Sequence, residues 1–309
     1  MKTLAEHLED YLSLRRRLGF KLVKAGHELR NFVLFIEQKK ARFITIKLAL
    51  QWAQSSTCRQ MQADRLGVVR GFARYLSALV PCTEIPPEGL ILFKQHRKAP
   101  YLYSDKEVVR LIKAAGQLRS ADKLRPSTYS TLFGLLAATG MRIAEAIGLD
   151  REDVDLKQSL LTLRQTKDSK WRLVPIHSTV RAKLRQYARC RDRLCPQPAC
   201  SNFFITEQGK ALVYITVHKW FIHLSHQIGL RQPTDHRGPH IHDLRHRFAI
   251  QTLLKWYRND QDVELHLADL TTYLGHGTVA GTYWYISGIP ELLKLATDRL
   301  EREQGGSRL

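Results

Sequence analysis

Apolar residues recur at helical spacing through most of the first 80 residues of the chain. Three apolar stripes predict helices near residues 4–12, 28–39 and 63–76. Their members are Leu4, Leu8, Tyr11 and Leu12, then Leu29, Phe32, Val33 and Ile36, then Ala63, Leu66, Val69, Phe72, Ala73 and Leu76. Gly19 marks the break after the first stripe. Basic residues lie between the apolar positions, which suits a small DNA-binding module and a plain helical bundle almost equally.

The helical pattern stops between residues 81 and 100. Prolines at positions 81, 86, 87 and 100 interrupt it, together with the basic run KQHRK at 94–98. Such stretches are typical of linkers. Because 309 residues are enough for about two domains, the sequence predicts an N-terminal helical domain with its linker over residues 1–98 and a second domain over residues 99–309.

Capping residues and glycine delimit two helices at the start of the second domain. Ser104 followed by Glu107 is a possible capping box, and this helix is expected to continue to about Ala115. A further helix is predicted from Pro126 up to Gly140.

Two runs that follow are typical of β-strands. SLLTLRQT and WRLVPIH are separated by KDSK at 167–170 and predict a β-hairpin. NFFIT at 202–206 is a candidate for a short third strand. Helical patterns then return up to the C-terminus. The predicted fold class is therefore mainly α with a small antiparallel β-sheet.

The charge of the chain narrows the range of partners. There are 49 Lys plus Arg against 29 Asp plus Glu, which gives a net charge of +20 and a pI of about 10.0. Such an excess favours a polyanion, since binding phosphates releases condensed counterions. Nucleic acid is the preferred interpretation; a merely soluble basic protein and an anionic membrane surface are the alternatives.

The composition gives little support to a membrane protein, a secreted protein or a zinc-binding protein. No apolar run approaches the ~18 residues of a membrane span, and no secretory signal opens the chain. We therefore expect a soluble cytoplasmic protein, associated with the nucleoid if the host is bacterial. Five cysteines are expected to be reduced thiols. Cys190, Cys195 and Cys200 lack the short CxxC spacing of structural zinc sites.

Two stretches pair an arginine with a second polar residue three positions away. In ATGMRIAEAIGL, residues 138–149, Arg142 and Glu145 share one face of a helix. Taken alone, they are better explained as a surface ion pair worth a few tenths of a kcal/mol. In HIHDLRHRF, residues 240–248, His242 and Arg245 share a face at the start of a helix, where backbone N–H groups also point outward.

Histidines gather around the second stretch and raise the question of a metal. They are His236, His240, His242 and His246. His242 and His246 have i,i+4 spacing, but Asp243 stands where zinc hydrolases carry a glutamate. Zinc is a minority interpretation.

A third stretch, LGHGTVAGTYWYIS at 274–287, places His276 ahead of Tyr283, Trp284 and Tyr285. These aromatics could be a buried cluster, or one tyrosine could be a nucleophile. Read in chain order, Arg142, Lys167, His242, Arg245, His276 and Tyr285 resemble the tyrosine recombinase (phage integrase) family. The match rests on ATGxRxxE, TKxxKxRxVPI, HDLRH, LGH and a tyrosine nine residues after that last histidine, and it covers residues 138–287.

The resemblance implies site-specific cutting and rejoining of duplex DNA without metal, ATP or other cofactor. Arg142 and Arg245 would hold the non-bridging phosphate oxygens, because the guanidinium fork forms paired charge-assisted hydrogen bonds. Tyr285 would be the nucleophile and form a 3′-phosphotyrosyl link, which stores the energy of the broken phosphodiester for rejoining. His242 is the expected base.

The same resemblance gives the remaining site residues their roles. Lys167 would protonate the leaving 5′-oxygen, His276 would bind the scissile phosphate, and Glu145 would orient its neighbours. Lys170 is a rival to Lys167, and the hairpin tip KDSK lacks the glycine that many relatives carry. Tyr283 is a rival to Tyr285 as the nucleophile.

Residues 257–273 make the interval from Arg245 to His276 longer than in compact chromosome-dimer resolvases, which favours an extra helix or loop that could serve as a partner surface. TYWYISGIPELL at 282–293 is more similar to recombinases of transposons and other mobile elements. The partners implied are double-stranded DNA and further copies of the chain, as a tetramer on two sites. Ile289, Leu292, Leu293, Leu295 and Ala296 form an apolar helix that would pass to a neighbouring protomer or fold back on its own domain.

Three alternatives to a recombinase are compatible with the sequence. A type IB topoisomerase would relax supercoiled DNA that lacks a target site, a regulator would bind DNA without cleaving it, and a zinc-dependent nuclease would be inactivated by EDTA. The target sequence, the need for accessory proteins, and the choice among integration, excision, resolution and transposition do not follow from the sequence.

Overall fold

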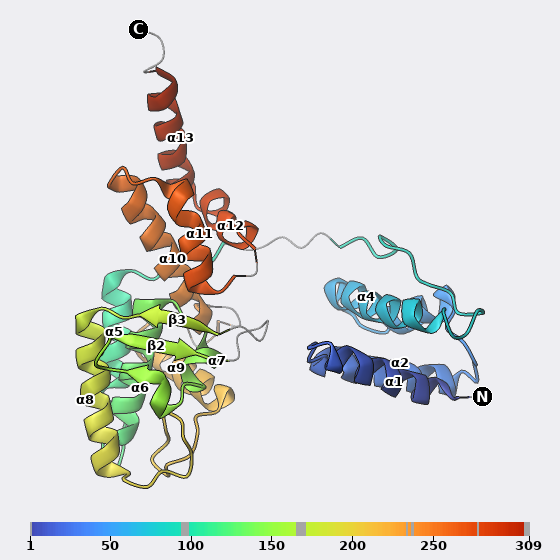
Figure 1. Cartoon of the computed structure of the whole chain (residues 1–309), viewed down its shortest axis with the longest axis horizontal. Coiled ribbons are helices and arrows are strands. Elements are labelled where there is room, and N and C mark those ends of the chain that lie inside the picture. Colours follow the sequence, from blue (N-terminus) through green and yellow to red (C-terminus); the bar gives the residue numbers. More distant parts are fainter. Residues whose placement is uncertain are drawn as a thin grey trace. The chain divides into compact units, whose positions relative to one another are not determined.

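The computed structural model describes residues 2–93, 99–164, 171–232, 234–235, 238–276 and 278–305. The chain divides into two compact units, Met1–Lys98 and Ala99–Leu309 (Figure 1). Within the described ranges, no helix is long and apolar enough to cross a membrane.

Four helices build the first unit. They are α1 (Leu4–Arg17), α2 (Val23–Gln38), α3 (Ile46–Gln54) and α4 (Arg59–Leu76). The three predicted stripes form the core between α1, α2 and α4, with Leu12, Phe32 and Phe72 fully buried. The helix α3 was not predicted, because its nine residues bury only Ala49, Trp52 and Ala53.

The predicted linker begins later than the sequence indicated. The Glu84 carboxylate accepts a hydrogen bond from the first backbone N–H of α3, at Ile46 (2.6 Å). Arg70 of α4 donates to the carbonyls of Pro86 (2.7 Å) and Pro87 (2.9 Å). Proline and charge predicted a linker from residue 81, but these contacts fasten residues 84–87 to the first unit. The basic run at 94–98 lies outside the described residues.

The second unit is mainly helical with one small sheet, as predicted. Its helices are α5 (Asp105–Ala115), α6 (Leu124–Thr139), α7 (Ile143–Ile147), the short 3₁₀ helix η1 (Arg151–Asp153), α8 (Ser178–Leu194), α9 (Tyr214–Gln227), α10 (Ile241–Arg258), α11 (Val263–Leu274), α12 (Ala280–Gly288) and α13 (Pro290–Gly305). The Ser104 capping box is present at the start of α5.

The sheet has three antiparallel strands in the order β1 (Val154–Asp155), β2 (Leu160–Leu163) and β3 (Arg172–Pro175). The hairpin prediction is confirmed, with Leu163 opposite Arg172 at the end of the ladder. The expectation of a strand at 202–206 is wrong. Residues 202 and 205 form only isolated bridges, and Phe203, Phe204 and Ile205 are all fully buried. Three consecutive buried side chains belong to a segment enclosed by the core rather than to a strand with one exposed face.

A glycine turn separates α6 from α7. Gly140 has φ +62°, and a Cβ on it would lie 2.5 Å from the Phe248 ring of α10. This position therefore requires glycine for its backbone conformation and for the close approach of α10. The turn brings Arg142, the N-cap of α7, beside α10 and α11.

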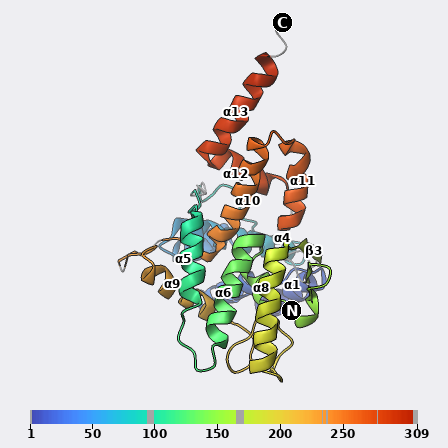
Figure 2. The ribbon, with the colours of Figure 1, turned by 90° about the vertical axis from the view of Figure 1, so that its left-hand side faces the viewer.

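The helix α10 connects two hydrophobic clusters of the second unit. Its first turn contributes Ile241 and Leu244 to the main core with α5, α6, α8 and α9. Its later residues, including Leu253, pack with α11, α12 and α13 in a second cluster that also contains Tyr285 (Figure 2). His242 and Arg245 therefore lie on α10 close to where the two clusters meet.

The C-terminal helix α13 folds back on its own unit, and its burial is deepest at the first turn. Leu292 and the preceding Ile289 are buried in the second cluster, and Arg258 binds Glu291 at 2.6 Å. Farther along, Leu300 is 57% exposed. Figure 1 and Figure 2 both show α13 extending away from the sheet side of the unit.

Candidate active site

Three arginines from separate segments bind consecutive carbonyls at the end of α11. Arg172 of β3 donates through Nε to Tyr273 O (2.9 Å). Arg245 of α10 donates through Nη2 to Leu274 O (2.6 Å), and Arg142 donates through Nη2 to Gly275 O (2.7 Å). Carbonyls at a helix C-terminus lack helical partners and carry partial negative charge, so they attract cations.

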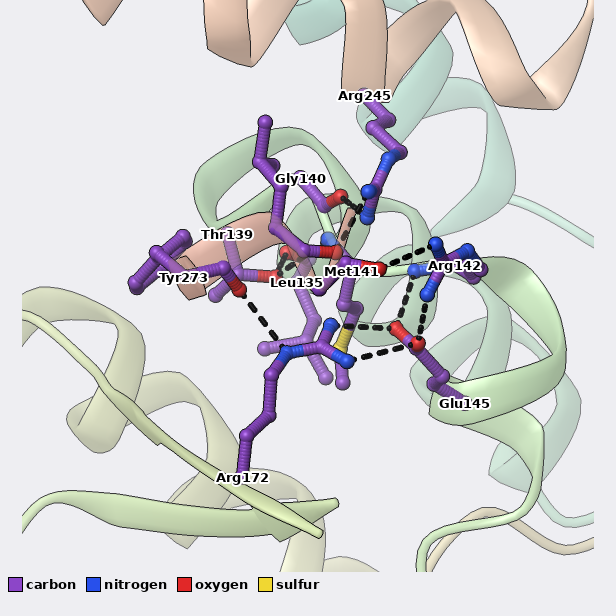
Figure 3. Close-up of polar contacts among 11 residues, drawn as sticks. Leu135, Thr139, Gly140, Met141, Arg142, Glu145, Arg172, Arg245 and Tyr273 are labelled. Atoms are coloured by element: carbon purple, nitrogen blue, oxygen red, sulfur yellow. Dashed lines mark hydrogen bonds and ion pairs between the residues drawn. The ribbon is translucent and has the colours of Figure 1, made fainter. Parts of the chain in front are cut away.

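Glu145 lies between two of these arginines, as Figure 3 shows. It accepts hydrogen bonds from the backbone N–H and Nη1 of Arg142, each at 2.8 Å, and from Nη1 and Nη2 of Arg172, at 3.0 and 2.9 Å. Burial raises the pKa of Glu145, but the bonds from Arg172 and Arg142 outweigh it and the net pKa is lowered. The carboxylate is ionised at neutral pH and holds both arginines.

Arg245 is the most deeply buried of the three arginines, with 2% of its surface exposed. Besides Leu274 O, it donates to Gly140 O at 2.9 Å (Figure 3). Burial, and after it the nearby Arg142, lower the pKa of its guanidinium to about 10. The group keeps its charge near pH 7. Three guanidinium groups against one carboxylate leave the site positively charged.

The two predicted histidines lie within this positive field. Burial, followed by Arg245 and Arg142, lowers the pKa of His242. Burial and the same two arginines lower the pKa of His276 to about 4. Both imidazoles are therefore neutral at pH 7. His276 Nδ1 pairs with the hydroxyl of Thr282 at 2.9 Å, which fixes its ring relative to α12.

The structure distinguishes the two candidate tyrosines. Tyr285 is 2% exposed, and its ring stacks 6.4 Å from that of His276. Its hydroxyl lies 2.9 Å from Nδ1 of His246. Tyr283 is 50% exposed. The chain therefore brings Tyr285 together with the predicted His276 and with His246, while Tyr283 lies at the surface.

The two candidate lysines, Lys167 and Lys170, lie outside the described residues. The flanking strand ends are described, and Arg172 at the start of β3 is part of the arginine cluster. His236 is also outside the described residues. In the described ranges, no group of three or more His, Cys, Asp or Glu side chains is arranged to hold a metal ion.

Two residues of the site had no assigned role in the sequence. Arg172 is the arginine of the TKxxKxRxVPI pattern, so its signal was present, but its contact with Glu145 depends on two segments 27 residues apart. His246 was considered only as a metal ligand. Its spacing of one residue from Arg245 gives no sign that it meets a tyrosine 39 residues later.

The arrangement can hold an anion and present a phenol to it. Arginines bind phosphate oxygens through fork-shaped pairs of donors, and neutral histidines can accept or donate a proton. An arginine pair, two histidines and a tyrosine on a mainly helical domain with a small sheet define the class of tyrosine-dependent DNA strand transferases.

Comparisons with known proteins agree with this class. The model of the phage integrase family matches residues 102–288. The chain is 46% identical over 308 residues to the putative integrase/recombinase y4rB of Sinorhizobium fredii (strain NGR234), with 98% of each chain covered. It is 28% identical over 293 residues to tyrosine recombinase XerC of Pseudomonas savastanoi pv. phaseolicola, with 91% of each covered.

Solved structures share the fold at low sequence identity. The integrase of transposon Tn1549, in complex with transposon right end DNA, matches with a TM-score of 0.69 at 13% identity and covers 97% of this chain and 99% of its own. The XerA recombinase matches with a TM-score of 0.51 at 21% identity, covering 97% and 98%. The chain belongs to the phage integrase family, and it is a tyrosine recombinase.

Proposed function

We propose that Tyr285 is the nucleophile of this recombinase and attacks a phosphodiester of duplex DNA held by Arg142 and Arg245. One observation carries this assignment: the buried Tyr285 ring stacks on His276. In the chain, His276 directly follows the two residues whose carbonyls bind Arg142 and Arg245. Tyr283, by contrast, is 50% exposed.

In the proposed step, Tyr285 Oη forms a bond to phosphorus while the bond from phosphorus to the 5′-oxygen breaks. The products are a 3′-phosphotyrosyl ester and a free 5′-hydroxyl, and attack by a second 5′-hydroxyl reverses the step without ATP. His242 takes the phenolic proton, consistent with its lowered pKa, and Lys167 gives a proton to the leaving oxygen. His276 donates to the phosphate, and the arginines stabilise its developing charge.

Double-stranded DNA and further copies of the chain are the proposed partners. The net charge of +20 supports the first. The folds of DNA-bound relatives, among them a lambda integrase tetramer bound to a Holliday junction (TM-score 0.59), support both. Residues 1–98 are proposed as the helical DNA-binding domain and residues 99–309 as the catalytic domain, with the C-terminal half of α13 reaching a neighbouring protomer. Its proposed place of action is cytoplasmic DNA.

Movement of a transposon or similar element is the proposed biological role, supported by the fold of the Tn1549 integrase. A type IB topoisomerase activity is the second candidate, because the same site chemistry would serve a recombinase and a topoisomerase. Relaxation of plasmid DNA without a target site separates the two.

The test uses a nicked suicide duplex that carries the DNA ends flanking the protein's own gene. We expect a covalent protein–DNA adduct at the 3′-phosphate with wild type, in the presence of EDTA, and none with Tyr285→Phe. Tyr283→Phe is the matched control and is expected to retain the adduct. An adduct that survives Tyr285→Phe would refute the assignment of the nucleophile, and no adduct with wild type despite specific binding would refute the proposed reaction.

A further inference from the structure

Backbone N–H groups and arginine side chains both cap the C-terminus of α11. Gly275 has φ +65°, and its N–H bonds to Thr272 O at 2.9 Å, while the N–H of His276 bonds to Thr271 O at 3.0 Å. This is the pairing of a Schellman turn, which leaves the following carbonyls without backbone partners. The next two carbonyls, of Tyr273 and Leu274, take up Arg172 and Arg245 instead. The C-terminus of α11 therefore fixes the backbone of His276 and also holds Arg172 and Arg245 through its free carbonyls.

Arg172 differs from the other arginines in how its donors are used. Its Nε binds Tyr273 O, and its Nη1 and Nη2 bind the two oxygens of Glu145. Every nitrogen of the guanidinium thus has a protein acceptor, and the side chain is 10% exposed. The side chain of Arg142 is 27% exposed. The geometry suits Arg142 for contact with a ligand and Arg172 for holding other groups in place.

We propose that Arg172 is a positioning residue that sets the place of Arg142 for the scissile phosphate. It acts through the Glu145 carboxylate, which binds the backbone and the guanidinium of Arg142. It also ties β3, the strand that follows residues 165–170 with both candidate lysines, to the end of α11. This inference rests on the proposed function, since it assigns a role in that same reaction.

A lysine could not make these contacts. The guanidinium binds both carboxylate oxygens with one edge and a carbonyl with its Nε, in fixed planar geometry, whereas an ammonium is a point donor. Gly275 is part of the same fit, because a Cβ there would lie 2.6 Å from Arg172 Nη1. Arg172, held by three bonding directions, could not move aside without giving up one of its contacts.

The test compares Arg172→Lys with a matched control, Arg164→Lys. Arg164 follows β2 on the same hairpin and also binds carboxylates, Glu152 at 3.0 Å and Asp153 at 2.6 Å, but its side chain is 55% exposed. Single-turnover cleavage of the suicide duplex at saturating DNA and the Kd for DNA are measured for each. We expect Arg172→Lys to slow cleavage by about 10- to 100-fold, with Kd changed by less than about threefold, as for a group displaced by about 1 Å. Arg164→Lys should match wild type.

Two further readouts separate positioning from general damage to the fold. Glu145→Gln combined with Arg172→Lys should cleave no more slowly than the slower single variant, because both changes interrupt one path to Arg142. A methylphosphonate at the scissile position removes a phosphate charge, so the deficit of Arg172→Lys relative to wild type should shrink by about tenfold or more. A deficit of equal size on both substrates would mean a structural role only.

Wild-type behaviour distinguishes the failure of this inference from that of the proposed function. If wild type forms the adduct and Arg172→Lys cleaves at the wild-type rate, Arg172 does not position the site and only this inference is overturned. If wild type and Arg164→Lys form no adduct, the proposed reaction itself is overturned.

Discussion

The hydroxyl of Tyr285 lies 2.9 Å from Nδ1 of His246, and the two rings meet edge to face at 5.5 Å between centroids. The His246 ring also meets His242 edge to face at 4.7 Å. The proposed nucleophile is therefore buried against His246, whose ring in turn contacts His242.

We predict that this contact contributes measurably to stability. His246→Ala should lower the free energy of unfolding by about 1–3 kcal/mol, the range for a buried polar group that loses its partner. His246→Asn should lose less, because an asparagine side chain can place a polar atom near the position of Nδ1. Urea denaturation of these variants, alone and combined with Tyr285→Phe, gives the coupling, which should be about 0.5–1.5 kcal/mol. In a control cycle, Tyr283→Phe takes the place of Tyr285→Phe and should show no coupling with His246→Ala. An equal coupling for Tyr283 would contradict the contact between Tyr285 and His246.

Stability should depend on pH through His276. Burial and the neighbouring arginines lower its pKa to about 4 in the folded protein, against about 6.5 when unfolded. A depressed histidine pKa means that the unfolded chain binds the proton first as the pH falls. This contribution to stability is thus complete above about pH 6.5 and is lost progressively toward pH 4.

The measurement is the denaturant midpoint of wild type and His276→Asn between pH 4 and pH 8. The variant should lose less stability over this window than wild type does. The exposed His223 provides the control, and His223→Gln should follow the wild-type curve. Parallel curves for all three proteins would rule out His276 as the source of the dependence.

Gly140→Ala should destabilise the protein more than the same change at another left-handed glycine. Gly140 and Gly229 have φ +62° and +73°, so each pays a backbone strain of about 1–2 kcal/mol on substitution. At Gly140 the new Cβ would also lie 2.5 Å from the Phe248 ring, whereas nothing lies within 4 Å at Gly229. Overpacking adds about 1–3 kcal/mol. Thermal and urea denaturation of both variants check the difference, and equal losses would refute the close approach of α10.

The two halves of α13 should respond differently to truncation of a leucine. Leu292 is fully buried in the second cluster, so Leu292→Ala should cost about 2–5 kcal/mol of stability. Leu300 is exposed, so Leu300→Ala should change the stability by less than about 0.5 kcal/mol. If the end of α13 reaches a neighbouring protomer, Leu300→Ala should instead reduce tetramers on paired DNA sites, as measured by analytical ultracentrifugation. Unchanged assembly would place the protomer contact elsewhere.

Much of the fold followed from local patterns. Stripes such as Leu29 to Ile36 predict helices because one face must be buried, and alternation with the KDSK turn predicts the hairpin. The prediction of a strand at 202–206 was wrong because the surrounding core buries its side chains on all sides. The local sequence pattern does not show this burial. The helix α3 was missed because nine residues offer too short a period.

The sequence by itself determined the family and the set of candidate site residues, since Arg142, His242, Arg245, His276 and Tyr285 stand in motifs with fixed order and spacing. Only the tertiary structure decided how these groups are held. The carbonyls of Tyr273, Leu274 and Gly275 carry no side-chain identity, so no motif can display them as acceptors for three arginines. The contact of Arg172 with Glu145 joins β3 to α7, and that of His246 with Tyr285 joins α10 to α12. These segments are far apart in the chain, and only tertiary packing brings such partners within hydrogen-bond distance.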